Sequence, residues 1–168
     1  MTKVQNKVRL AKRLAAIQGA PRKAIHEALK QGAEELTAMQ RRLAPVKSGD
    51  LKNSIGYTFG AYRLDNANVR GVSAGGGAAD PDLSVTIHAG DKKAWYAALV
   101  EFGTSAHMIK PKRPGGLLNI YGRLIPSVNH PGASAQPFFY PAWRAIRKRI
   151  RSRISRATTR SVKQAAGQ

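Results

Sequence analysis

The sequence predicts an α+β fold, in which an antiparallel sheet of about four strands has a long helix packed on one face. Apolar residues recur at steps of three and four between Ile25 and Leu43, which is the period of an amphipathic helix. Apolar residues alternate between Leu83 and Ala89, which is the period of a strand with one buried face. Strands and helices do not alternate regularly along the chain, and this favours an antiparallel sheet over βαβ units.

The long helix is expected to start at Pro21 and to end before Pro45. Proline is tolerated in the first helical turn, and the residue before a proline avoids helical angles. A looser apolar pattern lies upstream, and Gly19 and Ala20 interrupt it just before Pro21. We therefore expect a basic N-terminal arm over residues 1–20, distinct from the helix.

Four strands and one short helix are expected next. The strand segments alternate apolar or aromatic residues with polar ones, and the helical segment places its large apolar residues on one face before a glycine stop. The expected strands are residues 55–62, 83–89, 117–121 and 124–128, and the expected short helix is 93–102.

The segments between these elements are interpreted as loops. The glycine run at 75–77 could suggest a phosphate loop, but the Gly-Lys-Ser/Thr ending is absent and a hairpin tip is favoured. Residues 109–116 are expected to form a basic, proline-rich link, and Gly122 a turn between the last two strands. His88 falls on the outer face of its strand, where solvent contact is expected.

The last helix is expected to begin at Pro141 and is strongly basic. Residues 141–168 contain nine Lys and Arg and no acid, within a chain of net charge +20. Like charges three or four apart each destabilise a helix by about 0.2–0.5 kcal/mol. We therefore expect the part from about Ser152 to fray until an anionic neighbour orders it. The candidate contacts to that neighbour are Arg144, Arg147, Lys148 and Arg151.

The predicted organisation is a basic N-terminal arm over 1–20, an α+β domain over 21–145 and a basic C-terminal helix or tail over 146–168. No catalytic or metal chemistry is predicted for any of these parts. The chain has no cysteine, its four histidines lack metal-ligand spacing, and no serine sits in a nucleophile motif. The sequence contains no run of about 18 apolar residues, the length that a membrane-spanning helix needs. We therefore expect no enzyme activity, cofactor, metal, membrane contact or small-molecule substrate.

Three segments resemble the tail-completion, or head–tail joining, family of long-tailed phages. Residues 44–55 (APVKSGDLKNSI) resemble the segment that ends the family's first helix. Residues 96–112 (YAALVEFGTSAHMIKPK) resemble its Glu-Phe-Gly-Thr segment, and residues 128–142 (VNHPGASAQPFFYPA) its His-Pro-Gly and Pro-Phe segment. Order and spacing agree with the family over about residues 20–145.

This resemblance implies a structural virion protein, assembled in the host cytoplasm, that forms a ring, usually a hexamer, at the head-proximal end of the tail. The ring would complete the tail tube and join it to a neck, stopper or adaptor protein, and DNA would pass transiently through its lumen. Phe138 and Phe139 are either interface anchors or core residues. The interface candidates are Glu101, Phe102, Gly103, Thr104, His107, His130, Pro131, Gly132, Gln136, Pro137, Phe138 and Phe139.

A freestanding basic nucleic-acid-binding module is the alternative function. The net charge and the arginine-rich helix favour it, since such surfaces bind phosphates. The sequence contains no helix-turn-helix, zinc-finger or RNP-type signature. The three phage-like segments would also stay unexplained, and we therefore favour the head–tail interpretation. For the basic helix, we favour an acidic protein surface over DNA.

Overall fold

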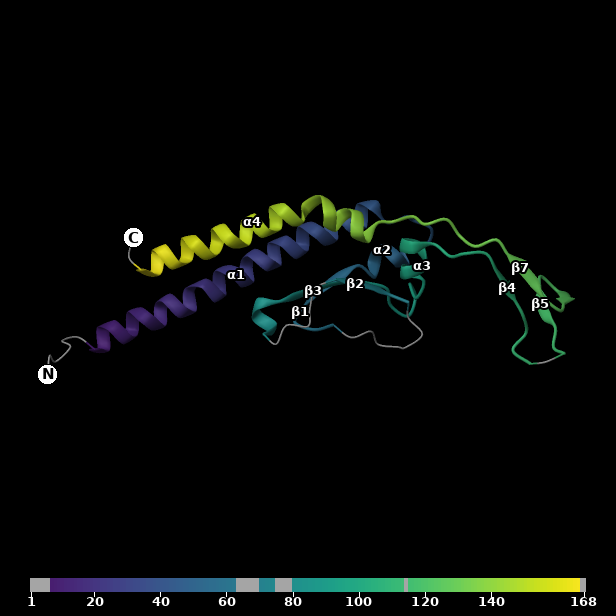
Figure 1. The fold of residues 1–168 in the computed structure, drawn as a ribbon, viewed down its shortest axis with the longest axis horizontal. Coiled ribbons are helices and arrows are strands. Elements are labelled where there is room, and N and C mark those ends of the chain that lie inside the picture. Colours follow the sequence, from purple (N-terminus) through teal and green to yellow (C-terminus); the bar gives the residue numbers. More distant parts are fainter. Residues whose placement is uncertain (1–6, 63–69, 75–79, 114, 167–168) are drawn as a thin grey trace.

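The computed structural model describes residues 7–62, 70–74, 80–113 and 115–166. Two long helices, α1 (Lys7–Leu43) and α4 (Phe139–Ala166), lie side by side and antiparallel above a small sheet (Figure 1). Two one- to two-turn helices, α2 (Asp50–Asn53) and α3 (Ala97–Phe102), lie at one end of this sheet. The predicted α+β class is confirmed.

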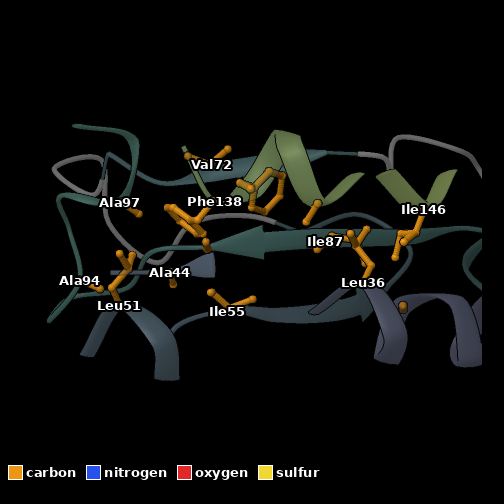
Figure 2. Packing of buried hydrophobic residues seen from close by; sticks show 14 of the residues in the cluster. Leu36, Ala44, Leu51, Ile55, Val72, Ile87, Ala94, Ala97, Phe138 and Ile146 are labelled. Carbon is orange, nitrogen blue, oxygen red and sulfur yellow. The ribbon is translucent and has the colours of Figure 1, made fainter. Parts of the chain in front are cut away.

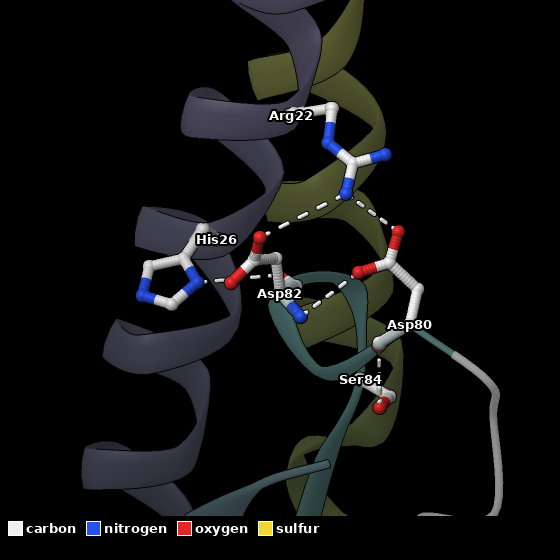
Figure 3. Close-up of polar contacts among 5 residues, drawn as sticks. All are labelled: Arg22, His26, Asp80, Asp82 and Ser84. Atoms are coloured by element: carbon white, nitrogen blue, oxygen red, sulfur yellow. Dashed lines mark hydrogen bonds and ion pairs between the residues drawn. The ribbon is translucent and has the colours of Figure 1, made fainter.

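Helix α1 begins at Lys7 and runs without interruption past Pro21, so the expected break at residues 19–21 is wrong. A proline inside a helix removes one hydrogen bond and crowds the preceding turn. The residues directly after it are held from outside the helix (Figure 3). Arg22 pairs with Asp80 at 2.6 Å, and His26 Nδ1 lies 3.1 Å from the carbonyl oxygen of Asp82. These contacts fix the helix to the turn that precedes the central strand, and the packing of α4 along α1 supports the helix as a whole.

The sheet under the helices has three antiparallel strands in the order β1 (Gly56–Phe59), β3 (Val85–Ala89), β2 (Val72–Ala74). Strands β1 and β3 were expected, but each is shorter than predicted. A 3₁₀ turn, η1 (Pro81–Leu83), replaces the expected start of β3 because the Asp80 side chain caps it. Strand β2 was missed, since three residues are too few to show an alternation.

His88 on β3 does not face solvent as expected. Its ring stacks on Tyr62 with centroids 3.7 Å apart, and its Nε2 lies 3.3 Å from Thr58 Oγ1. Its Nδ1 is buried and has no hydrogen-bond partner among the described residues. Burial removes water from the imidazolium form and therefore lowers the pKa of His88.

The hydrophobic core lies where α1 and α4 meet the sheet, and it continues to α2 and α3 (Figure 2). Leu36 from α1, Ile146 from α4 and Ile87 from β3 approach one another there. Phe138 and Ile55 fill the end nearer the short helices, and both are almost completely inaccessible. The start of α4 is thus part of the core.

Helix α4 begins at Phe139 rather than at Pro141, and it continues to Ala166. The part from about Ser152, which was expected to fray until an anionic neighbour orders it, is helical in the single chain. Helix α1 supplies both a packing surface and an acid, since Glu35 pairs with Arg153 at 2.8 Å and also with Arg149. Ser161, far along the helix, is buried. The neighbour that orders α4 is therefore within the same chain.

Two short ribbons project from the end of the molecule opposite the two termini (Figure 1). Strand β4 (His107–Ile109) pairs with β7 (Val128–His130), and β5 (Leu118–Ile120) pairs with β6 (Arg123–Ile125). We call residues 105–113 and 115–132 the arm. The predicted turn at Gly122 is confirmed, and the expected link over 109–116 instead starts as the end of β4.

Candidate subunit and partner interface

Glu101 holds the start of α4 in place. Its side chain is buried at the end of α3, and its two carboxylate oxygens accept three consecutive backbone N–H groups. These donors are Phe138 (2.7 Å), Phe139 (2.8 Å) and Tyr140 (3.0 Å). The first N–H groups of a helix have no partner within the helix, and a carboxylate there also interacts favourably with the helix dipole. Glu101 therefore joins the second phage-like segment to the third.

Two glycines let the same two segments cross at close range. Gly103 has φ 71°, and a Cβ there would lie 2.7 Å from the carbonyl oxygen of Ala133. Gly132 has φ 88°, and a Cβ there would collide with the carbonyl oxygen of Thr104. The positive φ angles and the lack of space both require glycine.

Backbone hydrogen bonds close this crossing. Thr104 and Ala133 exchange a pair of bonds, at 2.9 and 3.0 Å, and the N–H of Gln136 donates to the carbonyl oxygen of Val100 at 2.8 Å. We call residues 100–104 and 132–140 the arm root, in which Gly132 is the residue shared with the arm. The root fixes both ends of the arm to the core of the molecule.

The two phenylalanines of the root belong to the core. Phe138 and Phe139 are 0% exposed and meet edge to face with centroids 6.3 Å apart. Of the two alternatives that the sequence left open, the structure of the single chain favours core packing over a subunit anchor. Phe102, in contrast, is exposed, and Pro137 lies on the surface beside the buried pair.

His107 and His130 face each other across β4 and β7, with ring centroids 5.2 Å apart. His107 Nδ1 lies 3.0 Å from the carbonyl oxygen of Ser105, so this nitrogen carries the proton and donates. His130 Nδ1 accepts the N–H of Gly132 at 3.0 Å, which orders the His130-Pro131-Gly132 turn. Among the described residues, no three His, Cys, Asp or Glu side chains gather as a metal site.

The outer arm exposes large apolar side chains. Tyr121 is 102% exposed, Leu124 63% and Met108 58%. The turn at Gly122 was predicted from the sequence, but Tyr121 and Leu124 were not among the predicted interface residues. A glycine as the second residue of a two-residue hairpin loop was the available signal, because such loops hold both residues at positive φ.

The two sides of α4 differ in how their cations are paired. On the side next to α1, Arg149 and Arg153 share Glu35. The four predicted contact residues are all exposed, and within the described part of the chain none of them forms an ion pair. Arg151 also lines an apolar cavity of ≈ 260 Å³ between α1, α4 and β3. These four cations are Arg144, Arg147, Lys148 and Arg151.

A family model described as "Bacteriophage HK97-gp10, putative tail-component" matches residues 9–103. The match covers more than half of the chain and ends within the arm root, so it does not include the arm or α4. No curated protein and no solved structure matches the chain. In the described residues, no helix is both long enough and apolar enough to cross a membrane.

Proposed function

The chain belongs to the HK97-gp10-like family of phage tail components, and we propose that it completes the tail at the head–tail junction. In this role it forms a ring of six copies, in line with the family resemblance, on the head-proximal end of the tail tube. One face of the ring binds the tube protein, and the other binds a neck, stopper or adaptor protein. The role is structural, and DNA passes through the lumen without chemistry.

The observation that carries this proposal is the contrast within one continuous segment, between a buried arm root and an exposed arm. Glu101, Gly103 and Gly132 anchor the segment in the core, whereas Tyr121 and Leu124 extend into solvent. A large, exposed apolar surface on a fixed projection is typical of a protein–protein contact. A ring requires such contacts, because each subunit must present one surface to the next and a different one to its neighbours in the tail.

The unpaired cations of α4 support a second kind of contact. Four exposed positive charges on one helix attract an anionic surface and increase the rate of association. An acidic face of the tube or neck protein fits this requirement. DNA that must traverse the lumen quickly gains little from tight binding to phosphates.

The proposal is tested by mass photometry of the full chain across a salt series, with and without tail tubes from a phage mutant that lacks the protein. We expect rings, or attachment to one end of the tube that weakens as salt increases. A monomer that ignores tubes at every salt concentration contradicts the proposal.

The same four cations favour one alternative, a freestanding nucleic-acid-binding module. Truncation after residue 144 would remove Ile146 and Ile150 from the core, so substitution is the cleaner test. We expect the Gln variants of all four cations to retain the fold and to weaken attachment to tubes. If the wild-type chain ignores tubes but binds duplex DNA with a steep salt dependence that these variants abolish, the alternative is correct.

A further inference from the structure

We propose that the tip of the arm docks in an apolar pocket with an acidic rim on a different protein of the tail, and not on a second copy of this chain. The tip is the β5–β6 hairpin, residues 117–125, with Tyr121 and Gly122 as its loop. The identity of the neighbour as a tail protein rests on the proposed function. The chemistry of the pocket follows from the hairpin itself.

The two-residue loop requires a positive φ at position 121, but it does not require a tyrosine there, so the strain is avoidable. Tyr121 has φ 51°, the only positive value at a non-glycine residue in the described chain. A side chain in this region of the map is unfavourable, and glycine or asparagine would fit a two-residue hairpin loop better. The loop is already closed by Asn119, whose Oδ1 accepts the N–H of Gly122 at 2.9 Å. Strain that the fold does not need, at a fully exposed aromatic residue, indicates a binding role.

The hairpin is apolar on both of its faces. Leu124 lies opposite Asn119, and Leu117, two residues before Asn119, is also strongly exposed. The pair Leu118 and Ile125 forms the other face and is only half-buried. An isolated two-stranded hairpin is marginally stable in water and needs packing against a further surface. Figure 1 shows the ribbons away from α1, α4 and the three-stranded sheet, so the body of the same chain does not supply that surface.

The charge of the arm determines the kind of partner. No Asp or Glu follows Glu101 in the sequence, and the arm carries four exposed cations. An apolar pocket that receives this tip therefore requires acids on its rim. The four cations are Lys110, Lys112, Arg113 and Arg123.

A second copy of this chain does not meet the requirement. Each copy carries a net charge of +20, and its apolar cavity of ≈ 260 Å³ is lined in part by Arg151. Like charges would therefore meet where the tip entered. Phosphates of DNA would satisfy the cations of the arm, but they would leave Tyr121, Leu117 and Leu124 without an apolar partner.

The test measures attachment of the full chain to tail tubes purified from a phage mutant that lacks it. Tyr121→Gly removes the aromatic ring and relieves the strained φ, so its melting temperature should be unchanged or higher. We expect its attachment to tubes to weaken at least tenfold, and Tyr121→Phe to behave as the wild type. Val46→Ala is the matched control, because Val46 is an exposed apolar residue on the body.

A second experiment identifies the neighbour directly. A photo-crosslinking amino acid is placed at position 121 in the full chain during phage assembly, with position 46 as the control. We expect a product with another tail protein, attached at a segment that contains Asp or Glu. A product with a second copy of this chain, or no product above the control, overturns the inference.

The outcomes separate this inference from the proposed function. If the wild type attaches to tubes and Tyr121→Gly attaches equally well, the inference is wrong and the function stands. If the wild type does not attach, the function is wrong, and the crosslink alone decides the inference. If Tyr121→Gly instead loses affinity for a labelled DNA duplex by the same factor as for tubes, the tip is a DNA contact and the inference is overturned.

Discussion

The arm root and the arm tip are close in sequence, with Tyr121 twenty residues after Glu101 and eleven before Gly132, yet opposite physical requirements shape them. In the root, the buried Glu101 carboxylate accepts hydrogen bonds from backbone N–H groups, and Gly132 lies where no side chain fits. In the tip, Tyr121 is fully exposed in a backbone conformation that suits glycine. The root is therefore stabilised by contacts within one chain, whereas the tip exposes a surface that is available to a partner.

The largest expected effect is at Glu101. In the wild type, the Glu101 carboxylate accepts three backbone N–H groups, whereas Glu101→Gln turns an amide N–H₂ toward this set of donors. We therefore expect the free energy of unfolding to fall by about 3 kcal/mol. Urea denaturation of the full chain measures this loss. Glu27→Gln, at an exposed position with Gln31 as its partner, should change stability by less than about 0.5 kcal/mol. Equal effects at the two positions would show that the root is not part of the core.

Gly132→Ala tests whether the crossing of the two segments is close-packed. The new Cβ meets the carbonyl oxygen of Thr104, and the positive φ adds strain, so we expect a loss of about 2–3 kcal/mol. Gly115→Ala is the control, because Gly115 has φ 73° but open space around it. Its expected loss is about 1 kcal/mol, from strain alone. Chemical denaturation of both variants separates the collision from the strain.

Glu35→Gln examines the pairing of α4 with α1. It leaves Arg149 and Arg153 without their acid, and these groups are partly exposed, so we expect a loss of only about 1 kcal/mol. Arg144→Gln on the unpaired side of α4 should cost nothing measurable. Thermal melts at low and high salt provide the measurement, and the effect of Glu35→Gln should shrink as salt rises. A loss for Arg144→Gln as large as for Glu35→Gln would remove the distinction between the two sides.

The smallest expected effect is a pH dependence of stability that arises from His88 in the body of the molecule. Burial lowers the pKa of His88, so in the acid range the unfolded chain binds a proton that the folded chain does not. Stability should fall as pH drops below about 6.5, the unperturbed value for histidine, and level off below the lowered pKa. His88→Phe keeps the stack on Tyr62 and should flatten this decline, measured by denaturation between neutral and acidic pH. A decline of the same slope in His88→Phe would contradict the assignment to His88.

The sequence predicted the parts of the fold that repeat a period over many residues. The apolar stripe from Ile25 to Leu43 indicated the long helix, and the alternation before Ala89 indicated the central strand. The error at Pro21 arose because local propensity cannot anticipate contacts from distant residues such as Asp80. Strand β2, only three residues long, gave no periodic signal.

The candidate site was predicted in part. Glu101, Gly103 and Gly132 were selected from the family-like segments, and the structure brings them together at the root. Whether they also contact another subunit stays a prediction. Glu35 could not be selected, because sequence alone does not say which acid faces which arginine across two helices. Tyr121 was missed, although Gly122 as the second residue of a two-residue loop indicates a positive φ at the residue before it.

Hydrogen exchange of the full chain, free and bound to tail tubes, tests the division between root and tip most directly. In the free protein, we expect slow exchange at the amides of Phe138 and Phe139, which donate to Glu101, and fast exchange at the loop around Tyr121. On tubes, the loop around Tyr121 should slow further. If root and tip exchange at the same rate in the free chain, or if the tip stays fast on tubes that the protein has bound, then the root is not the anchor and the tip is not the contact.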